Sequence, residues 1–142
     1  MKNAIDDKDS KILRTLKEDS RLSIREIAKK TNLRPSTIHK RIARLKEEEV
    51  IQKFTVKLDD EKMGEGFIVF MFVKTKPSTI LDNYVLKDGH IKEVYGVTGE
   101  YDLLIKLKFR DVGEFNDFLL QFRKEQKIEE TLTMVVTALI KE

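Results

Sequence analysis

Residues 23–45, with the sequence SIREIAKKTNLRPSTIHKRIARL, limit the possible folds of this chain more than any other stretch. Ser23 and Glu26 have the spacing of a capping box, in which each side chain accepts a backbone amide at the start of a helix. After a polar turn over residues 31–33, Pro35 suits the first turn of a second helix, where its missing N–H group costs no hydrogen bond. Helix, short turn and helix together predict a helix-turn-helix.

The second of these helices has a cationic face beside an apolar one. At about 100° per residue, its polar side carries Thr37, Lys40, Arg41 and Arg44, and its apolar flank carries Ile38, Ile42 and Leu45. The apolar stripe needs a core, whereas the cationic stripe faces water or an anion. An ordinary solvated surface helix has a similar stripe, but the capped helix before it favours entry into a DNA major groove.

Composition excludes several classes. A chain of 142 residues can form one ordinary domain or two small ones. It has no apolar run near the roughly 18–20 residues that span a bilayer, and its start lacks the apolar core of a signal peptide, so we expect a cytoplasmic protein that contacts no membrane. Without cysteine, and with His39 and His90 far apart, we expect no metal and no cofactor. The sequence has no nucleophile–base pair, so we expect no catalytic residue and no enzyme.

The net charge of +3 hides an uneven distribution. Residues 1–57 contain 16 Lys and Arg against 9 Asp and Glu, a net +7, whereas residues 58–142 contain 12 against 16, a net −4. A basic front half before an acidic back half indicates an N-terminal domain that binds a polyanion.

A further helix is expected before the helix-turn-helix. Residues 6–19 have apolar positions at helical spacing, with Asp6 as the expected N-cap, and complete a three-helix core. Arg41 then has two open roles, an ion pair with Asp9 across that core or a contact with phosphate. At the far end, Glu49 stands where helices often finish in a left-handed residue, at a cost on the order of 1 kcal/mol.

The second half predicts an alternation of strands and helices. Residues 51–58 alternate like a wing strand, and the polar stretch 59–66 contains two glycines. Beyond it we expect strands over 67–74, 91–98, 101–109 and 129–140, with helices over 80–86 and 111–124. This β-α-β-β-α-β order is the ferredoxin-like arrangement. The fold class is α+β: an N-terminal winged helix-turn-helix over residues 1–50, a strand and linker over 51–66, and a C-terminal ferredoxin-like domain over 67–142.

The expected strand over residues 67–74, FIVFMFVK, is apolar on both faces, and the last strand is nearly as apolar. Helices can cover only one face of such a sheet, so the other face would be a large exposed apolar patch in a monomer. We therefore expect a homodimer formed through the second half of the chain.

At this point the residues resemble the Lrp/AsnC family of prokaryotic transcription regulators. The matching residues in the first half are Asp6, Asp9, Ile12, Leu13, Arg21, Ser23, Glu26, Ile27, Ala28, Thr37, Ile38, Arg41, Ile42, Leu45, Val50 and Ile51. In the second half they are Val94, Tyr95, the run Val97-Thr98-Gly99, Tyr101, Asp102, Thr131, Thr133, Val135 and Val136. The resemblance implies a C-terminal module that dimerises through its sheet, assembles further into tetramers or octamers, and often binds an amino acid between subunits.

Three positions depart from the family pattern. Arg34 replaces the usual serine cap before the second helix, Glu49 replaces the usual helix-ending glycine, and Gln126-Lys127 stands where Pro-Gly is common. None lies on the cationic face, so the resemblance still implies DNA binding.

The resemblance and the helical wheel together give candidate DNA contacts. A dimer would present two copies of the helix over residues 35–48 to double-stranded DNA, in major grooves about one helical turn apart. Phosphate contacts are expected from Arg34, Lys40, Arg44 and Arg25, and base-edge contacts from Ser36, Thr37 and Lys40. Arg41 has the two roles given above, and His39 either reaches the DNA backbone or is merely exposed.

The candidate effector site is the turn Thr98-Gly99-Glu100-Tyr101-Asp102. Gly99 permits close backbone approach, so main-chain amides can receive a carboxylate while Glu100 or Asp102 takes an ammonium group. By resemblance, Thr131 and Thr133 add hydroxyls nearby. The alternative is an ordinary turn in which the Asp102 carboxylate is already hydrogen-bonded.

Two other functions remain open from the sequence. One is an amino-acid sensor that does not bind DNA, against which the intact cationic stripe argues. The other is an enzyme like the sirohaem decarboxylases, which resemble this family in fold; the acidic second half, whose only histidine is His90, argues against it.

Overall fold

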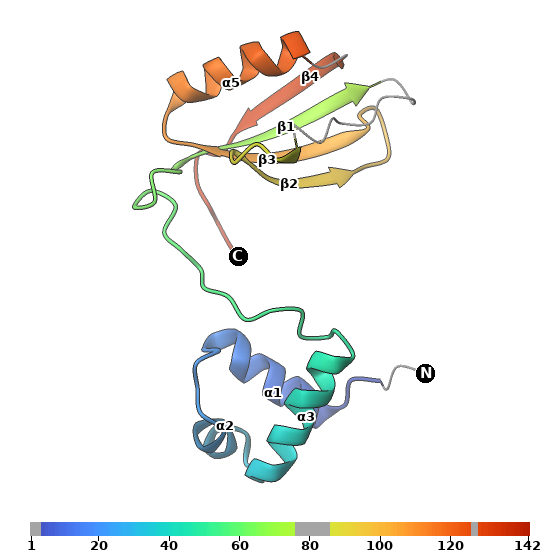
Figure 1. Ribbon diagram of the computed structural model, residues 1–142, viewed down its shortest axis with the longest axis vertical. Helices are drawn as coiled ribbons and strands as arrows, with labels where there is room; N and C mark the ends of the chain where they lie inside the picture. Colours follow the sequence, from blue (N-terminus) through green and yellow to red (C-terminus); the bar gives the residue numbers. More distant parts are fainter. Residues whose placement is uncertain (1–3, 76–85, 126–127) are drawn as a thin grey trace. The chain divides into compact units, whose positions relative to one another are not determined.

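The computed structural model describes residues 4–75, 86–125 and 128–142 (Figure 1). It divides into two compact units, the N-terminal unit Met1–Lys57 and the C-terminal unit Leu58–Glu142. Among the described helices, none is both long and apolar enough to cross a membrane.

The N-terminal unit contains the three expected helices, α1 (Asp7–Glu18), α2 (Ile24–Thr31) and α3 (Pro35–Glu47). Ile12, Ile27 and Ile38, one from each helix, are almost completely buried and form the centre of the core. Further apolar residues pack around them: Leu16, Leu22, Ile24, Ala28, Leu33 and Ile42. The helix-turn-helix that the sequence predicts is therefore confirmed.

The helix ends follow the local sequence signals. Asp6 caps α1 reciprocally with Asp9, and Ser23 caps α2 reciprocally with Glu26. Arg34 gives α3 no side-chain cap, and Pro35 occupies its first turn. Each cap satisfies amide groups that the helix itself leaves without a partner.

Two non-glycine residues among those described have positive φ, and both end helices. Asn32 ends α2 with φ of 56°, which asparagine tolerates. Glu49 follows α3 with φ of 57°, as the sequence predicts. The amide of Ile51 then donates to the Leu45 carbonyl at 2.9 Å, so the turn also satisfies a terminal carbonyl of the helix.

The C-terminal unit is a four-stranded antiparallel sheet with α5 (Val112–Glu125) across one face (Figure 1). The strands are β1 (Phe67–Thr75), β2 (Ile91–Gly96), β3 (Leu103–Phe109) and β4 (Ile128–Val135), in the spatial order β2-β3-β1-β4. This is the expected ferredoxin-like strand order. The helix expected over residues 80–86 lies outside the described residues except for Leu86, and Gln126-Lys127 also lies outside them.

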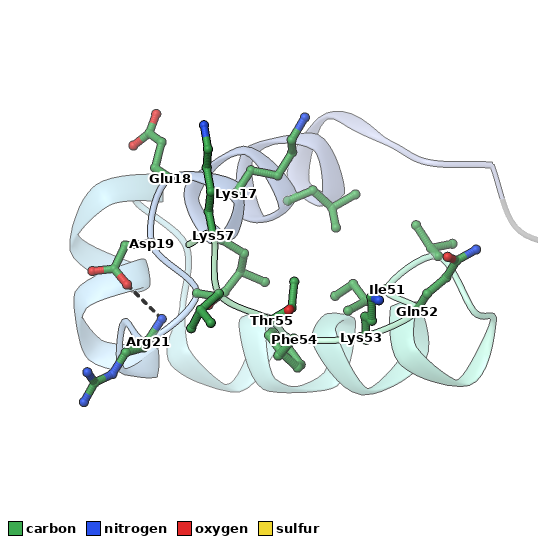
Figure 2. Close-up of a pocket in the computed structure, with 15 residues that line it drawn as sticks. Lys17, Glu18, Asp19, Arg21, Ile51, Gln52, Lys53, Phe54, Thr55 and Lys57 are labelled. Atoms are coloured by element: carbon green, nitrogen blue, oxygen red, sulfur yellow. Dashed lines mark hydrogen bonds between the residues drawn. The ribbon is translucent and has the colours of Figure 1, made fainter. Parts of the chain in front are cut away.

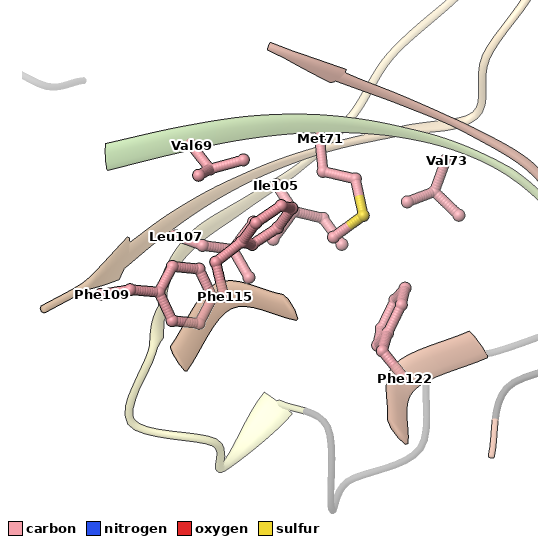
Figure 3. Close-up of a cluster of buried hydrophobic side chains, with 8 residues drawn as sticks. All are labelled: Val69, Met71, Val73, Ile105, Leu107, Phe109, Phe115 and Phe122. Atoms are coloured by element: carbon pink, nitrogen blue, oxygen red, sulfur yellow. The ribbon is translucent and has the colours of Figure 1, made fainter. Parts of the chain in front are cut away.

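The core of this unit lies between the sheet and α5 (Figure 3). Alternate residues of β1 and β3 point towards the helix, and Phe115 and Phe122 of α5 meet them. The buried strand residues are Val69, Met71, Val73, Ile105, Leu107 and Phe109. Phe109 and Phe115 meet edge to face with ring centroids 5.4 Å apart, an arrangement that aromatic pairs prefer.

The other side of the sheet is apolar and incompletely covered. We call it the open face; the register places on it the apolar residues Ile68, Phe70, Phe72, Leu104, Leu132 and Met134, with Lys106 and Lys108 of β3 beside them. The three β1 residues and Leu104 are half-buried, whereas Leu132 and Met134 are 40% and 51% exposed. Within one chain, β1 is thus fully buried on one face only, although its sequence is apolar on both.

Two strand predictions were wrong. Residues 51–58 form no strand, because no strand in the described part of the chain pairs with them. The last strand ends at Val135 rather than at residue 140. Its partner β1 begins at Phe67, and the last backbone bond joins the Val136 amide to the Ile68 carbonyl at 2.9 Å. In both places the sequence alternates as a strand does, but the described residues include no neighbouring strand to pair with it.

The stretch before β1 is fixed to the sheet by charge. Lys108 contacts Asp60 at 2.5 Å and Lys92 contacts Glu65 at 2.7 Å. Residues 59–65 therefore belong to the C-terminal unit as a turn docked on β2 and β3.

Candidate DNA-binding surface and effector turn

The outer edge of α3 carries the residues that the sequence assigned to DNA. Ser36, His39 and Lys40 are exposed, and Thr37 is half-buried beside them. Two further candidate cations, Arg34 before α3 and Arg25 on α2, are also exposed. In the described ranges, the side chains of the three candidate cations Arg25, Arg34 and Lys40 make no hydrogen bond or ion pair, so they are available to an anion.

Arg41 and Arg44 are arranged differently, because both turn towards α1. Arg41 Nη1 lies 2.8 Å from Asp9 Oδ1 and 2.7 Å from Asp6 Oδ1. Arg44 Nη2 lies 2.6 Å from Asp9 Oδ2, and its Nη1 lies 2.8 Å from Glu48 Oε2. The ion pair between Asp9 and Arg41, one of the two roles left open by the sequence, is present. Arg44 was expected to be a free phosphate contact, and in this structure it is already paired.

Asp9 is at the centre of this cluster and is only 1% exposed. Burial raises its pKa, but the hydrogen bonds from Arg44 and Arg41 outweigh that effect and lower the pKa below its usual value. The amide of Asp9 and then the Arg41 guanidinium lower the pKa of Asp6 to about 2. Both carboxylates are therefore ionised at neutral pH, and each compensates charge on α3.

Two hollows lie beside these elements. A small one of about 330 Å³ is lined by the paired cluster and Lys40, and also by Ala4. A larger groove of about 860 Å³ runs between the end of α1 and the extended stretch over residues 50–57 (Figure 2). Its floor includes Leu13, Leu16 and Ile51, and Lys46 of α3 lies 5.9 Å from the centre of the Phe54 ring. The stretch therefore packs on the helices although it forms no strand.

The turn between β2 and β3 has the backbone geometry that a glycine permits. Gly99 has φ of +129°, where a side chain would be strained, and the space that a Cβ would occupy is open. Thr98, Gly99, Glu100 and Asp102 are exposed. Tyr101 is half-buried, with its ring 5.6 Å from that of Phe72. The turn thus offers exposed amides and two carboxylates.

Asp102 also has a structural role. Its Oδ2 accepts the Thr75 amide at 2.9 Å, and its own amide donates to the Val73 carbonyl at 3.0 Å. This carboxylate continues the hydrogen bonding of β1 past the end of β3. The alternative was an ordinary turn in which the Asp102 carboxylate is already hydrogen-bonded. One of its two oxygens is hydrogen-bonded in this way, to the Thr75 amide.

Thr131 and Thr133 lie on β4, on the face of the sheet that α5 covers. Val73 pairs with both Leu103 and Thr131, so the turn and Thr131 lie at the same end of the sheet on either side of β1. The Thr131 hydroxyl accepts from Arg123 of α5 at 3.1 Å. The structure therefore brings the candidate effector residues to one end of the sheet, with β1 between the two groups.

The sequence reasoning missed the second partner of Asp9. The signal was present, because Asp6 and Asp9 are three residues apart and so are Arg41 and Arg44, which gives two matched pairs on facing helices. It also missed the contact of Glu93 with Tyr95 and Lys106 on the sheet surface. The hydrogen bond to Glu93 raises the pKa of Tyr95.

In the parts of the chain that the structure describes, no group of acidic, histidine or cysteine side chains is placed to hold a metal ion.

Comparison with known proteins gives matches to both units. A winged helix-turn-helix DNA-binding model matches residues 5–52, and an Lrp/AsnC ligand binding domain model matches residues 68–142. The chain is 43% identical over 140 residues to an uncharacterised HTH-type transcriptional regulator of Pyrococcus furiosus, which covers 97% of this chain and 95% of that relative.

Solved structures give the same picture. The chain is similar to an AsnC family transcriptional regulator from Agrobacterium tumefaciens, with a TM-score of 0.89, 27% identity, and coverage of 96% of this chain and 93% of that one. It is also similar to a transcriptional regulator of Neisseria meningitidis solved as a complex with L-Met, with a TM-score of 0.91, 24% identity, and coverage of 98% and 94%. The second likeness concerns the fold.

Proposed function

The chain belongs to the Lrp/AsnC family of transcription regulators, and we propose that it binds operator DNA through α3 as a homodimer. The observation that supports this most is the exposed edge of α3, which we define as Ser36, Thr37 and Lys40. Its hydroxyls and its unpaired ammonium group suit base edges and phosphates. We propose that Arg34, Arg25 and His39 lie near the DNA backbone.

The division of the chain follows the proposed roles. We assign DNA binding to residues 1–50, connection to 51–66, and effector binding and oligomerisation to 67–142. A transcription regulator acts in the compartment that contains the DNA, so we propose a cytoplasmic location. The comparisons with transcription regulators favour neither a sensor without DNA binding nor a sirohaem decarboxylase-like enzyme.

Substitution of one lysine tests the proposed contact surface. Lys40→Gln should weaken binding to operator DNA about tenfold and reduce the salt slope by about one, because each phosphate contact releases counterions. Lys8→Gln is the matched control, since Lys8 is an exposed lysine on α1 away from this edge. Fluorescence anisotropy on a labelled duplex measures both quantities, and equal effects of the two substitutions would refute the assignment of Lys40.

The open face supports the proposed dimer. It gathers six apolar residues from three adjacent strands, and the same face of a second copy would cover it in a face-to-face packing of sheets. Two copies related by a two-fold axis would then present two α3 helices to half-sites about one helical turn apart. We propose further assembly of dimers into tetramers or octamers.

We propose that the turn over residues 98–102 binds a free amino acid between subunits. The amides around Gly99 suit a carboxylate, and Glu100 with the remaining Asp102 oxygen suits an ammonium group. The relative from Neisseria meningitidis was solved with L-Met, which makes methionine the first candidate. Isothermal titration with a panel of amino acids tests this. Gly99→Val, which strains the backbone, should abolish the binding heat seen with the unchanged chain.

A further inference from the structure

The cluster around Asp9 does more than join two helices. Asp9 is almost fully buried on α1, and each of its two carboxylate oxygens holds a different arginine of α3. Its Oδ2 also accepts the Asp6 amide at 3.2 Å as part of the helix cap. One carboxylate thus binds two of the four cationic side chains of α3 from within the N-terminal unit.

Both arginines are held towards α1 by bonds from their Nη groups to carboxylates, which compensate their charge. Arg41 Nη1 is shared between Asp9 and both oxygens of Asp6, at 2.8, 2.7 and 2.8 Å. Arg44 uses one Nη group for Asp9 and the other for Glu48. Their side chains are 24% and 25% exposed, whereas Lys40, the residue before Arg41, is exposed and unpaired among the described residues.

Phosphate contacts and base contacts have different consequences. An arginine on phosphate strengthens binding to every sequence, because the backbone is the same everywhere. An arginine whose charge is already compensated by a carboxylate of the protein adds little to that background. The ratio of specific to non-specific affinity then depends on the groups that reach base edges.

We infer that Asp9 is a specificity-determining residue: by holding Arg41 and Arg44 against α1, it keeps both guanidinium groups off the DNA phosphates. This inference rests on the proposed binding of DNA by α3. The exposed edge of α3 then distinguishes operator from random sequence, and Asp9 weakens binding to random sequence.

Asp9→Asn tests the inference with little change of shape. The amide oxygen of asparagine can still accept the Asp6 amide, but the charge of the carboxylate that joins Arg41 to Arg44 is removed. Asp6 then remains the partner of Arg41, and Glu48 that of Arg44. The variant should bind a random duplex about tenfold more tightly at low salt, with a salt slope steeper by about one per subunit. Its preference for operator over random duplex should fall about tenfold. A merely structural role would leave the salt slope unchanged.

Asp7→Asn is the matched control. It removes the same charge from the same turn of α1, and Asp7 is exposed and makes no ion pair with another residue that the structure describes. It should leave the slope and the preference close to those of the unchanged chain. Equal effects of Asp7→Asn and Asp9→Asn would show a general charge effect and would overturn the inference.

A second variant decides the matter if Asp9→Asn does not fold, which circular dichroism reveals. Arg44→Gln keeps a donor for Asp9 and removes the charge; it should leave the salt slope of the otherwise unchanged chain as it is. A decrease by about one would mean that Arg44 contacts phosphate and would overturn the inference. If the unchanged chain binds no DNA, the proposed function itself fails. If it binds with sequence preference but these variants disagree, only the role of Asp9 fails.

Discussion

Glu49 shows how a single residue can store strain that its neighbours hold in place. Its φ of 57° is unfavourable for a residue with a Cβ, and the hydrogen bond from Ile51 to Leu45 keeps the turn closed. Single hydrogen bonds also matter in the acidic cluster. They lower the pKa of Asp6, and they lower the pKa of Asp9 although its burial acts in the opposite direction.

The strain at Glu49 predicts that Glu49→Gly stabilises the protein. Glycine adopts this conformation freely, so the free energy of unfolding should rise by about 1 kcal/mol, less a small entropic loss. Glu47→Gly, within the last turn of α3, should instead lower it by about 1 kcal/mol. Urea denaturation of the full chain measures both. Destabilisation by Glu49→Gly would contradict the account.

The pKa of Asp6 predicts acid sensitivity. Because its pKa in the folded protein is about 2, against an ordinary value of 3.8, the stability it contributes is complete above about pH 4. That contribution is lost as pH falls from about 4 to about 2, and the lowered pKa of Asp9 acts in the same direction. Asp6→Asn should flatten the dependence of the urea midpoint on pH in this range, whereas Asp7→Asn should not.

At the scale of helices and strands, signals between near neighbours were predictable and pairings between distant segments were not. The caps of α1 and α2 and the left-handed Glu49 depend on residues within a few positions, and the sequence contains all of them. The stretch over residues 51–58 alternates as a strand does, but alternation does not supply a partner. The end of β4 at Val135 depends on where β1 begins, at Phe67, 68 residues earlier in the chain.

Side-chain partners across helices show the same limit. The helical wheel placed Arg44 on the cationic face correctly, but a wheel does not say what packs against that face. Asp9, which is buried on another helix, forms an ion pair with Arg44 and so turns this side chain towards α1. The effector turn was found from Gly99, yet the bond from Asp102 to Thr75 depends on the sheet register.

The Ser23 cap gives a prediction for α2. Ser23→Ala removes the hydroxyl that accepts the Glu26 amide and should lower the free energy of unfolding by about 0.5–2 kcal/mol. Ser10→Ala is the control, since Ser10 is exposed within α1 and alanine favours helices. The same loss in both variants, measured by urea denaturation, would show that the cap contributes nothing.

At the scale of the whole molecule, the open face is the feature that a single chain leaves unexplained. Phe72→Glu places a charge on it between Leu104 and Leu132, and should weaken dimerisation at least tenfold because the carboxylate would be buried among apolar neighbours. Leu120→Glu is the control, since Leu120 is 70% exposed on α5. Analytical ultracentrifugation gives the monomer–dimer equilibrium. A dimer that Phe72→Glu does not affect would contradict the proposed interface.

Recognition of a DNA sequence through α3 is the function that we propose for this chain. The most direct test is fluorescence anisotropy of the purified protein on a duplex from the region upstream of its own gene and on a random duplex of equal length, at several salt concentrations and with methionine present and absent. We expect steep salt dependence on both duplexes and a preference of at least about a thousandfold for the specific one. Absence of binding to either duplex at low salt would contradict this proposal.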